Sequence, residues 1–198
     1  MSLKARIIEE SLKLFSLNGY WHTSVTDILA AAGTSKGGFY NHFASKEHLF
    51  YAVLEHAQRL WRARTLSGLD HIEDPLGKIE QFLLNYRDRY LKDTDTFPGG
   101  CIFVTLSVEL DDQNPGLCAE VDKGFMGLKR MLRGFLEQAK SQGKLVKDVD
   151  TDEVVEMIFA GMLGSSVSYG VTKSTSMLDQ SIQSLITYLR TLGSNGSN

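Results

Sequence analysis

The sequence predicts an all-helical protein. Only three prolines occur among the 198 residues, and none of them interrupts a stretch of helical periodicity. Two of these prolines directly follow Asp74 and Asn114, and a capping residue followed by proline is a favourable helix start. Apolar residues recur at three- and four-residue steps along most of the chain, and no strand-like alternation is long enough to compete.

The first two helices have recognisable ends. Apolar residues over 3–18 share one broad face, and the Gly19 that follows is a favourable C-terminal signal. The second helix is short, because Ser24 and Asp27 resemble a capping box at its start and Gly33 ends it. Both helices therefore precede a glycine turn.

Two more helices are expected before residue 68. Either Thr34 or Ser35 can cap a third helix, which runs to about Phe43. Ser45 can cap a fourth helix, whose apolar residues continue as far as Trp61. The N-terminal part of the chain is therefore expected to hold a cluster of helices joined by short turns.

The remainder of the chain predicts five further helices, each recognised by its apolar periodicity. A glycine at residue 143 ends the longest of them, and Asp150 and Glu153 frame the start of the next. The glycine- and serine-rich tail is expected to be disordered. The five helices cover 75–90, 101–110, 115–143, 150–172 and 178–192.

Charge is divided unevenly along the chain. The first 46 residues carry a formal charge of +2 and the remainder carries −5, within a net charge of −3. Between Ile28 and Lys46 there is no acidic residue, whereas Lys36, Lys46 and His42 can face an anion. A polyanionic partner is therefore expected at the N-terminal end of the chain.

The composition predicts a soluble, cytoplasmic protein that does not enter a membrane. The longest apolar runs fall short of the ~20 residues that cross a bilayer, and the N-terminus is charged where a signal peptide would be apolar. The two cysteines, Cys101 and Cys118, form no CxxC pair, so neither a structural disulfide nor a metal site is expected. No cofactor is expected either.

Residues 24–43 predict a helix-turn-helix, with a glycine turn and a short second helix rich in hydrogen-bonding groups. Such a helix fits the major groove of B-form DNA, and its N-terminal amides attract phosphate. Asn41 and Thr34 are expected to contact bases, and Phe39 to contact a thymine methyl. Helical hairpins with other roles are common, so the pattern alone leaves both interpretations open. The expected phosphate contacts are Ser35, Lys36, Tyr40 and Lys46.

The run from Ile7 to Glu55 closely resembles the N-terminal domain of the TetR family of transcriptional repressors. The chain departs from the family pattern at Thr34, Gly38 and Phe39, which bears on the operator sequence rather than on the mode of binding. The residues that carry the resemblance are Phe15, Gly19-Tyr20, Thr23-Ser24-Val25, Ile28, Ala32-Gly33, Ser35-Lys36-Gly37, Tyr40, Phe43 and Ser45-Lys46-Glu47.

The resemblance implies a one-component repressor that acts as a homodimer on a palindromic operator of double-stranded DNA. Each N-terminal domain would read one half-site, and the C-terminal domain would bind a small-molecule effector that releases the DNA. The expected domains are a DNA-binding domain over 1–47, an effector-binding and dimerisation domain over 48–192, and a disordered tail over 193–198. Carried over by position, the DNA-facing residues are Ser24, Thr34, Ser35, Lys36, Gly37, Tyr40, Asn41, His42 and Lys46.

The last two helices are expected to form the dimer. Small residues gather on one side of the penultimate helix and allow another helix to approach closely, and the last helix adds an apolar stripe over 178–192. Two such helices from each subunit would make a four-helix interface. The alternative is that both helices are buried within one chain. The small residues are Gly161, Gly164, Ser165 and Ser168.

Aromatic residues beyond the helix-turn-helix predict an effector cavity, because ligand pockets favour aromatic walls with a few polar groups. Ordinary core packing is the alternative for any one of them, and Trp61, Tyr86 and Phe125 are the strongest candidates. The full set is Trp61, Phe82, Tyr86, Tyr90, Phe103, Phe125, Phe159 and Tyr169.

Cys101 is a candidate effector contact of a different kind. It follows Gly99-Gly100 at a helix start, where amides would stabilise a thiolate and flexible glycines would leave room for a reactant. This segment resembles a subset of TetR-family repressors that respond to electrophiles or oxidants through cysteine, which implies that modification of Cys101 induces release. Burial as a small apolar residue is the alternative, and Cys118 is expected to be inert packing.

Little in the sequence supports an enzyme. There is no GxSxG, HExxH or Walker motif, and the histidines lack metal-ligand spacing. A third possibility is a ligand-binding helical dimer without DNA-binding activity. Lys36, Tyr40 and Lys46 argue against that possibility, because all three suit contacts with phosphate.

Overall fold

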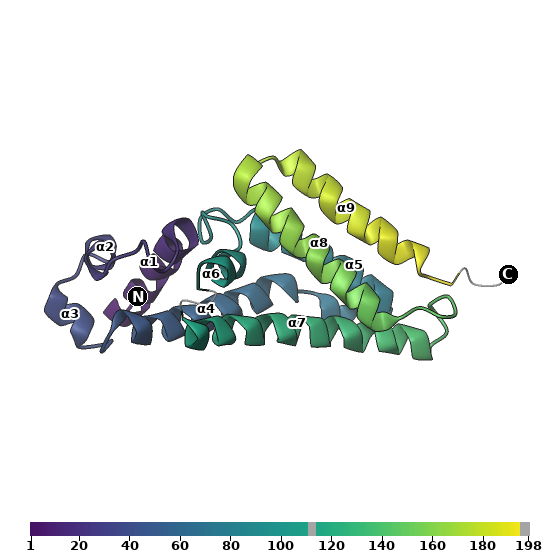
Figure 1. Cartoon of the computed structure of the whole chain (residues 1–198), viewed down its shortest axis with the longest axis horizontal. Coiled ribbons are helices and arrows are strands. Elements are labelled where there is room, and N and C mark those ends of the chain that lie inside the picture. Colours follow the sequence, from purple (N-terminus) through teal and green to yellow (C-terminus); the bar gives the residue numbers. More distant parts are fainter. Residues whose placement is uncertain (111–113, 195–198) are drawn as a thin grey trace. The chain divides into compact units, whose positions relative to one another are not determined.

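Helices form the regular secondary structure of this protein, and the all-helical prediction is confirmed. The computed structural model describes residues 1–110 and 114–194. Over these ranges there is no strand, and an isolated bridge joins Leu145 to Gly193. Figure 1 labels the helices in chain order.

The helices group into two units. The first comprises Met1–Arg62 and Asp93–Asp122, and the second comprises Ala63–Lys92 and the chain from Lys123 onward. Because α4 and α7 are long, each of them contributes to both units. The predicted boundary after residue 47 separates DNA binding from effector binding, whereas these two units are defined by packing. The functional boundary stays a prediction.

The first unit holds the short helices of the N-terminal region. Glycine ends α1 as predicted, since Gly19 has a φ of 78° and donates its backbone N–H to the carbonyl oxygen of Phe15. The capping box at the start of α2 is confirmed, with Ser24 and Asp27 each bonding the other's backbone N–H. The helices of this unit are α1 (Leu3–Asn18), α2 (Val25–Ala31), α3 (Lys36–Tyr40), most of α4 (Lys46–Thr65), α6 (Ile102–Leu110) and the start of α7 (Pro115–Ser141).

Helix α3 is shorter than the sequence predicts. Ser35 is its N-cap and accepts a hydrogen bond from the backbone N–H of Gly38 at 3.2 Å. The helix ends at Tyr40 rather than near Phe43, because the N–H of His42 turns back to the carbonyl oxygen of Phe39. A tight turn therefore separates α3 from α4.

Aromatic rings form the centre of the first unit. Phe15, Phe43 and Phe50 are fully buried there. The Tyr20 ring meets both Phe15 and Phe50 edge to face, with ring centroids 5.6 and 5.3 Å apart. The loop after α1 is therefore attached to the core by its tyrosine.

Helix α6 packs on α1 within the first unit (Figure 1). The segment before α6 approaches α1 so closely that a Cβ atom at Gly99 would collide with the carbonyl oxygen of Ser16. The Ser16 hydroxyl also accepts a hydrogen bond from the Gly99 N–H at 3.1 Å. Gly99 therefore serves close packing rather than flexibility.

The second unit contains the remaining helices. Asp74 caps α5 through a 2.8 Å bond from the Gly77 N–H, with proline at the first helical position as predicted. The elements of this unit are the 3₁₀-helix η1 (Leu69–His71), α5 (Pro75–Asn85), the π-helix η2 (Tyr86–Leu91), most of α7, α8 (Thr151–Thr172) and α9 (Thr175–Thr191).

The predicted helix over 75–90 changes character part-way. Its last turn is the π-helix η2, which begins directly after the buried Asn85. The Asn85 side-chain amide donates to the carbonyl oxygens of Thr65 and Ser67 at 3.1 and 2.8 Å. These bonds hold the end of α5 against the preceding segment at the point where the helix widens.

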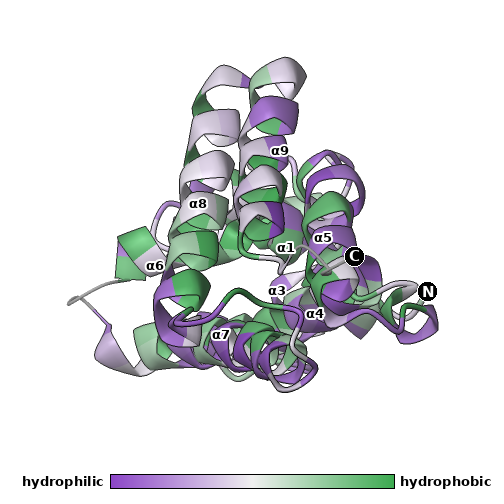
Figure 2. Ribbon diagram, turned by 90° about the vertical axis from the view of Figure 1, so that its right-hand side faces the viewer, coloured by the Kyte–Doolittle hydropathy of each residue, from purple (hydrophilic) through white to green (hydrophobic). Residues whose placement is uncertain are grey.

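Helices α8 and α9 lie side by side (Figures 1 and 2). Lys173, with a φ of 52°, turns the chain between them. After α9, Ser194 donates its backbone N–H to the carbonyl oxygen of Lys144 at 2.8 Å. Gly193 and Ser194, the first two residues of the predicted tail, thus have a described structure, and 195–198 lie outside the described residues.

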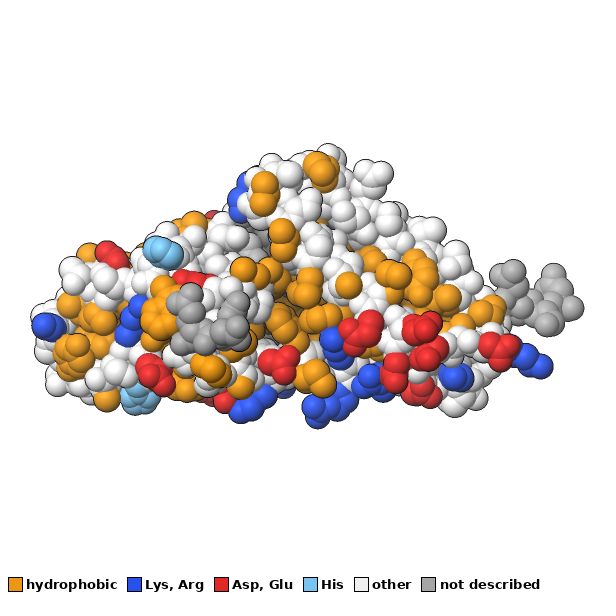
Figure 3. Space-filling view, in the orientation of Figure 1, with side chains coloured by type: hydrophobic (Ala, Val, Ile, Leu, Met, Phe, Trp, Pro, Cys, Tyr) orange, Lys and Arg blue, Asp and Glu red, His pale blue; other side chains and the backbone are white. Residues whose placement is uncertain are grey.

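Helix α8 is apolar on faces that its own chain leaves open. Among the described residues, it is the helix that is long and apolar enough to cross a membrane by length and composition alone. Only 39% of its most apolar window is buried. Hydrophobic side chains lie along this part of the surface (Figure 3). Core helices of soluble proteins share this composition.

Candidate DNA interface

Two capping residues position the helix-turn-helix. Ser24 fixes the start of α2, and Ser35 fixes the start of α3. The hydrogen bonds from Ser24 hold the pKa of Asp27 below its usual range. Asp27 is therefore ionised at neutral pH and keeps its charge within the capping box.

Most of the predicted DNA-facing residues are exposed. Tyr40 is 49% exposed, although tyrosine is a large and partly apolar side chain. No acidic residue lies between Ile28 and Lys46 to oppose a phosphate. The exposed members of the predicted set are Ser24, Ser35, Lys36, Gly37, Tyr40, Asn41 and His42.

The prediction that Phe39 contacts a thymine methyl is wrong for this fold. Phe39 is fully buried, and its ring packs against those of Tyr40 and Phe43 at 5.2 and 5.8 Å between centroids. Its side chain is buried in the core of the first unit and anchors α3 to that core. Phe39 is therefore a core residue of α3, the predicted reading helix, rather than part of its exposed surface.

Thr34 and Gly38, two of the departures from the family pattern, are neighbours. A Cβ atom at Gly38 would collide with the Thr34 hydroxyl oxygen, so the glycine makes room for the threonine. Thr34 is half-buried, which limits the part of it that a base could reach. The two departures are therefore a matched pair.

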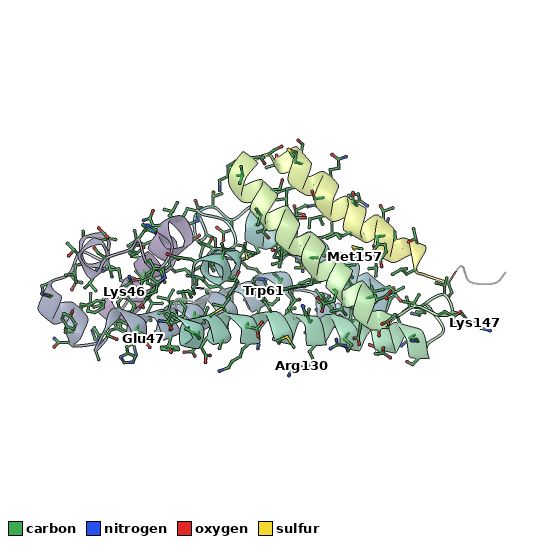
Figure 4. The ribbon with its side chains drawn as sticks, viewed as in Figure 1. Lys46, Glu47, Trp61, Arg130, Lys147 and Met157 are labelled. Carbon is green, nitrogen blue, oxygen red and sulfur yellow. The ribbon has the colours of Figure 1, made fainter. Side chains whose placement is uncertain are left out.

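Lys46 occupies a different environment from Lys36. Its ammonium lies 4.1 Å from the centre of the Tyr20 ring, at the start of α4 (Figure 4). Partial burial lowers the pKa of Lys46, while the carboxylates of Glu109 and Asp27 oppose that shift. Lys46 is therefore a positioned cation, whereas Lys36 is exposed.

Glu109 is a residue that the sequence reasoning missed. It lies on α6, and its carboxylate accepts the backbone N–H groups of Tyr20 and Trp21 at 2.6 and 2.7 Å. No local signal marks this contact, because 89 residues separate Glu109 from Tyr20. The glycine at residue 19 was the available hint, since a Cβ atom there would collide with the Glu109 carboxylate.

The predicted effector residues are divided between the two units. Phe82 and Tyr86 lie together in the second unit, stacked with ring centroids 6.4 Å apart, and the Tyr86 hydroxyl is hydrogen-bonded to that of Ser166. Phe125, also in the second unit, meets Phe159 edge to face at 5.3 Å. Tyr90 and Tyr169 also belong to the second unit, whereas Trp61, Cys101 and Phe103 belong to the first.

Both cysteines are free thiols, and Cys101 is only 7% exposed. Gly99 packs tightly on α1, whereas a Cβ atom at Gly100 would meet no described atom within 4 Å. The expected room for a reactant beside Cys101 therefore stays a prediction. Over residues 1–110 and 114–194, no group of three or more His, Cys, Asp or Glu side chains is arranged to hold a metal ion.

Two family models match the chain. Residues 7–53 match bacterial regulatory proteins of the tetR family, and residues 75–185 match the tetracyclin repressor-like C-terminal domain. The second match alone covers more than half of the 198 residues. The chain belongs to the tetR family. DNA binding and a response to a ligand are typical of tetR-family regulators.

Individual relatives are similar over nearly the whole chain. The transcriptional repressor DhaR of Mycobacterium sp. (strain GP1) is 27% identical over 179 residues, which cover 90% of this chain and 87% of DhaR. The repressor NemR of Escherichia coli (strain K12) is 25% identical over 83% of this chain and 82% of its own. A solved tetR-family regulator from Chloroflexus aurantiacus J-10-FL has a TM-score of 0.89 and 29% identity over 96% of both chains.

Proposed function

We propose that this tetR-family regulator is a one-component repressor that binds a palindromic DNA operator as a homodimer and releases it when an effector binds. The observation that carries the proposal is the exposure of Lys36, Tyr40 and Asn41 at α3, within a segment from Ile28 to Lys46 that has no acidic residue. These side chains suit the major groove of a duplex.

The proposed DNA contacts divide into two roles. Lys36, Ser35, Tyr40 and Lys46 contact phosphates, which position the protein without reading sequence. Asn41 at the end of α3 contacts a base edge, because its amide can donate and accept at once. The other proposed DNA contacts, by side chain or backbone, are Ser24, Thr34, Gly37 and His42.

The proposed dimer forms through α8 and α9. Met157 and Val171 on α8 are 54% and 81% exposed, and the helix contains no charged residue between Met157 and Thr172 (Figure 4). An exposed apolar helix of this length in a DNA-binding regulator favours burial against a second copy. Family membership supports this assignment over a membrane span, because α8 lies within the matched C-terminal domain.

Dimerisation explains how binding can be switched. Two recognition helices must be about 34 Å apart to enter successive turns of the major groove, so a small change between subunits prevents simultaneous docking. The effector need not touch α3 to release the operator. The proposed place of action is the cytoplasm, where bacterial DNA lies.

The proposed effector is a small molecule that contacts the C-terminal part of the chain. The Tyr86 hydroxyl, bonded to Ser166 among stacked rings, offers a polar group in apolar surroundings. Phe82 and Phe125 are further proposed contacts in the same unit. Trp61, Cys101 and Phe103 belong to the first unit and are proposed separately as contacts there. An electrophile that modifies Cys101 is a specific form of this proposal.

A selection from random duplexes tests the function. The purified protein is incubated with a pool of random-sequence duplexes, and the bound fraction is sequenced over repeated rounds. Enrichment of an inverted repeat is expected, with an affinity that falls steeply as salt is added. Recovery of unselected sequences at every round would contradict the proposal and would favour a ligand-binding dimer without DNA-binding activity.

A further inference from the structure

We propose that Glu109 is a positioning residue for operator binding, which it supports by holding the loop that carries Tyr20 and thereby the ammonium of Lys46. This inference rests on the proposed function and goes beyond it, because Glu109 belongs to α6 and lies outside the helix-turn-helix. Three contacts within the first unit connect Glu109 on α6 to Lys46, a proposed phosphate contact.

The first two contacts join α6 to the loop after α1. One oxygen of the Glu109 carboxylate accepts the Tyr20 N–H and the other accepts the Trp21 N–H, so both oxygens are used. Hydrogen bonds to a charged acceptor are stronger than neutral ones. The carboxylate is only 17% exposed, which limits competition from water.

The two backbone hydrogen bonds are the main interactions of Glu109, because neither His22 nor Lys46 bonds it directly. His22 is the nearest basic side chain in the loop, at 3.8 Å, but it is 84% exposed and too far for a direct hydrogen bond. Lys46 interacts with Glu109 electrostatically rather than through a direct bond. The backbone of the loop is therefore the group that Glu109 holds.

The third contact joins the loop to the phosphate-binding cation. The Tyr20 ring is buried against Phe15 and Phe50, and Lys46 Nζ lies 4.1 Å from its centre. If the Tyr20 backbone moves, the ring that supports Lys46 moves with it. Glu109 therefore determines where the ammonium is presented to DNA.

The positioning role predicts that removing the negative charge of Glu109 lowers the affinity for DNA. Removing a negative charge beside a polyanion site would strengthen DNA binding if Glu109 acted through its charge alone. A positioning role predicts the opposite. We expect E109Q to weaken binding to a selected duplex by about threefold to thirtyfold, because glutamine can accept only one of the two N–H bonds.

The salt dependence of binding separates positioning from a general loss of folding. Each phosphate contact contributes about 0.9 to the slope of log K against log salt. We expect E109Q and K46M each to lower the slope by about one contact, and E109Q to add nothing in the K46M background. A partly unfolded variant would instead lose affinity with an unchanged slope.

Two further variants keep the test decisive. E55Q removes the same charge from an exposed position on α4 and should bind as wild type or slightly more tightly. Y20L leaves the backbone bonds to Glu109 in place but removes the ring beneath Lys46, and it should reproduce the slope of K46M. Y20L thus tests the route even if E109Q fails to fold.

The outcomes separate this inference from the proposed function. If the wild-type protein prefers no duplex, the proposed function fails and the role of Glu109 fails with it. If the wild-type protein binds its selected duplex while E109Q binds equally or more tightly, the positioning role is overturned and the proposed function stands. A Y20L variant with the wild-type salt slope would also overturn the positioning role.

Discussion

Gly161 on α8 lies against Leu185 on α9, and a Cβ atom at residue 161 would stand 2.5 Å from the Leu185 Cδ2 atom. Gly164, three positions further along α8, has no described atom within 4 Å of the corresponding position. The small residues of α8 therefore serve two faces. One face packs α9 of the same chain, and we propose that the other meets a second copy.

A large side chain should have a different effect at each of the two glycines. G164R should split the dimer without lowering the thermal stability of the monomer, since arginine is a better helix former than glycine. G161L should destabilise the fold by about 1–3 kcal/mol through overpacking against Leu185. Sedimentation velocity and thermal unfolding measure the two effects separately.

Gly134 on α7 supplies the matched control, because it is exposed and also has no described atom within 4 Å of a Cβ position. G134R should remain dimeric. A G164R protein that sediments as wild type would rule out the proposed interface.

The reading helix predicts two kinds of loss. K36A and Y40A should weaken binding to all duplexes alike, because both side chains are proposed phosphate contacts. N41A should relax sequence preference by about 1–3 kcal/mol at the base that it reads. Gel shifts against the selected operator and its single-base variants measure both effects, and wild-type behaviour in all three variants would refute the assignment of α3.

The burial of Phe39 predicts a loss of stability rather than a change of specificity. F39A should cost about 3–5 kcal/mol, because the residue is fully buried among aromatic rings. F39L should fold and keep the wild-type preference at every base pair. Chemical denaturation measures the first effect and a single-base operator panel the second. A thymine-specific loss in F39L would restore Phe39 as a base contact.

Asp74 predicts a pH-dependent contribution to stability. Its carboxylate bonds Lys144 at 2.7 Å and caps α5, and the bond from Lys144 is the main cause of a lowered pKa. A lowered folded pKa stabilises the fold above the unfolded value of ~4, and this contribution is lost as pH falls through the folded pKa.

Two substitutions separate the parts of the Asp74 contribution. D74N keeps a helix cap but loses the ion pair, so it should cost no more than about 1 kcal/mol at neutral pH, since both partners are over 40% exposed. D74A should cost about 1–2 kcal/mol because the cap is lost as well. Denaturation between pH 2 and 7 checks both values, and a D74N deficit that persists at the lowest pH would contradict the ion-pair origin.

Cys101 predicts slow modification in the native protein. Since the thiol is only 7% exposed, alkylation should be much slower than in the unfolded chain, and modification should weaken operator binding by disturbing the tight contact at Gly99. Thiol labelling followed by a gel shift measures both steps. C101S should bind DNA normally and resist release by an electrophile, and release equal to wild type would exclude the sensor role.

Local signals in the sequence predicted most helix boundaries. Ser24 with Asp27, Asp74 before proline and Gly19 after α1 each act over a few residues, so their effects can be read from neighbouring positions. The exposure of the polar residues around α3 was predictable for the same reason. In a helix as short as α3, polar side chains are exposed either to solvent or to a binding partner.

Long-range contacts account for what the sequence did not predict. Phe39 looked like a surface residue of the reading helix, and only the packing of α3 places it in the core. The π-helix follows Asn85, whose side-chain amide donates to carbonyl groups 18 and 20 residues away. Glu109 and Tyr20 are further apart still, and no spacing rule joins them.

The most direct test of a dimeric operator-binding protein is the stoichiometry of its complex with the selected duplex, measured by sedimentation equilibrium. The account predicts a dimer without DNA, two subunits per inverted repeat, and a large loss of affinity when one half-site is scrambled. A monomer that binds a single half-site as tightly as the full repeat would contradict it.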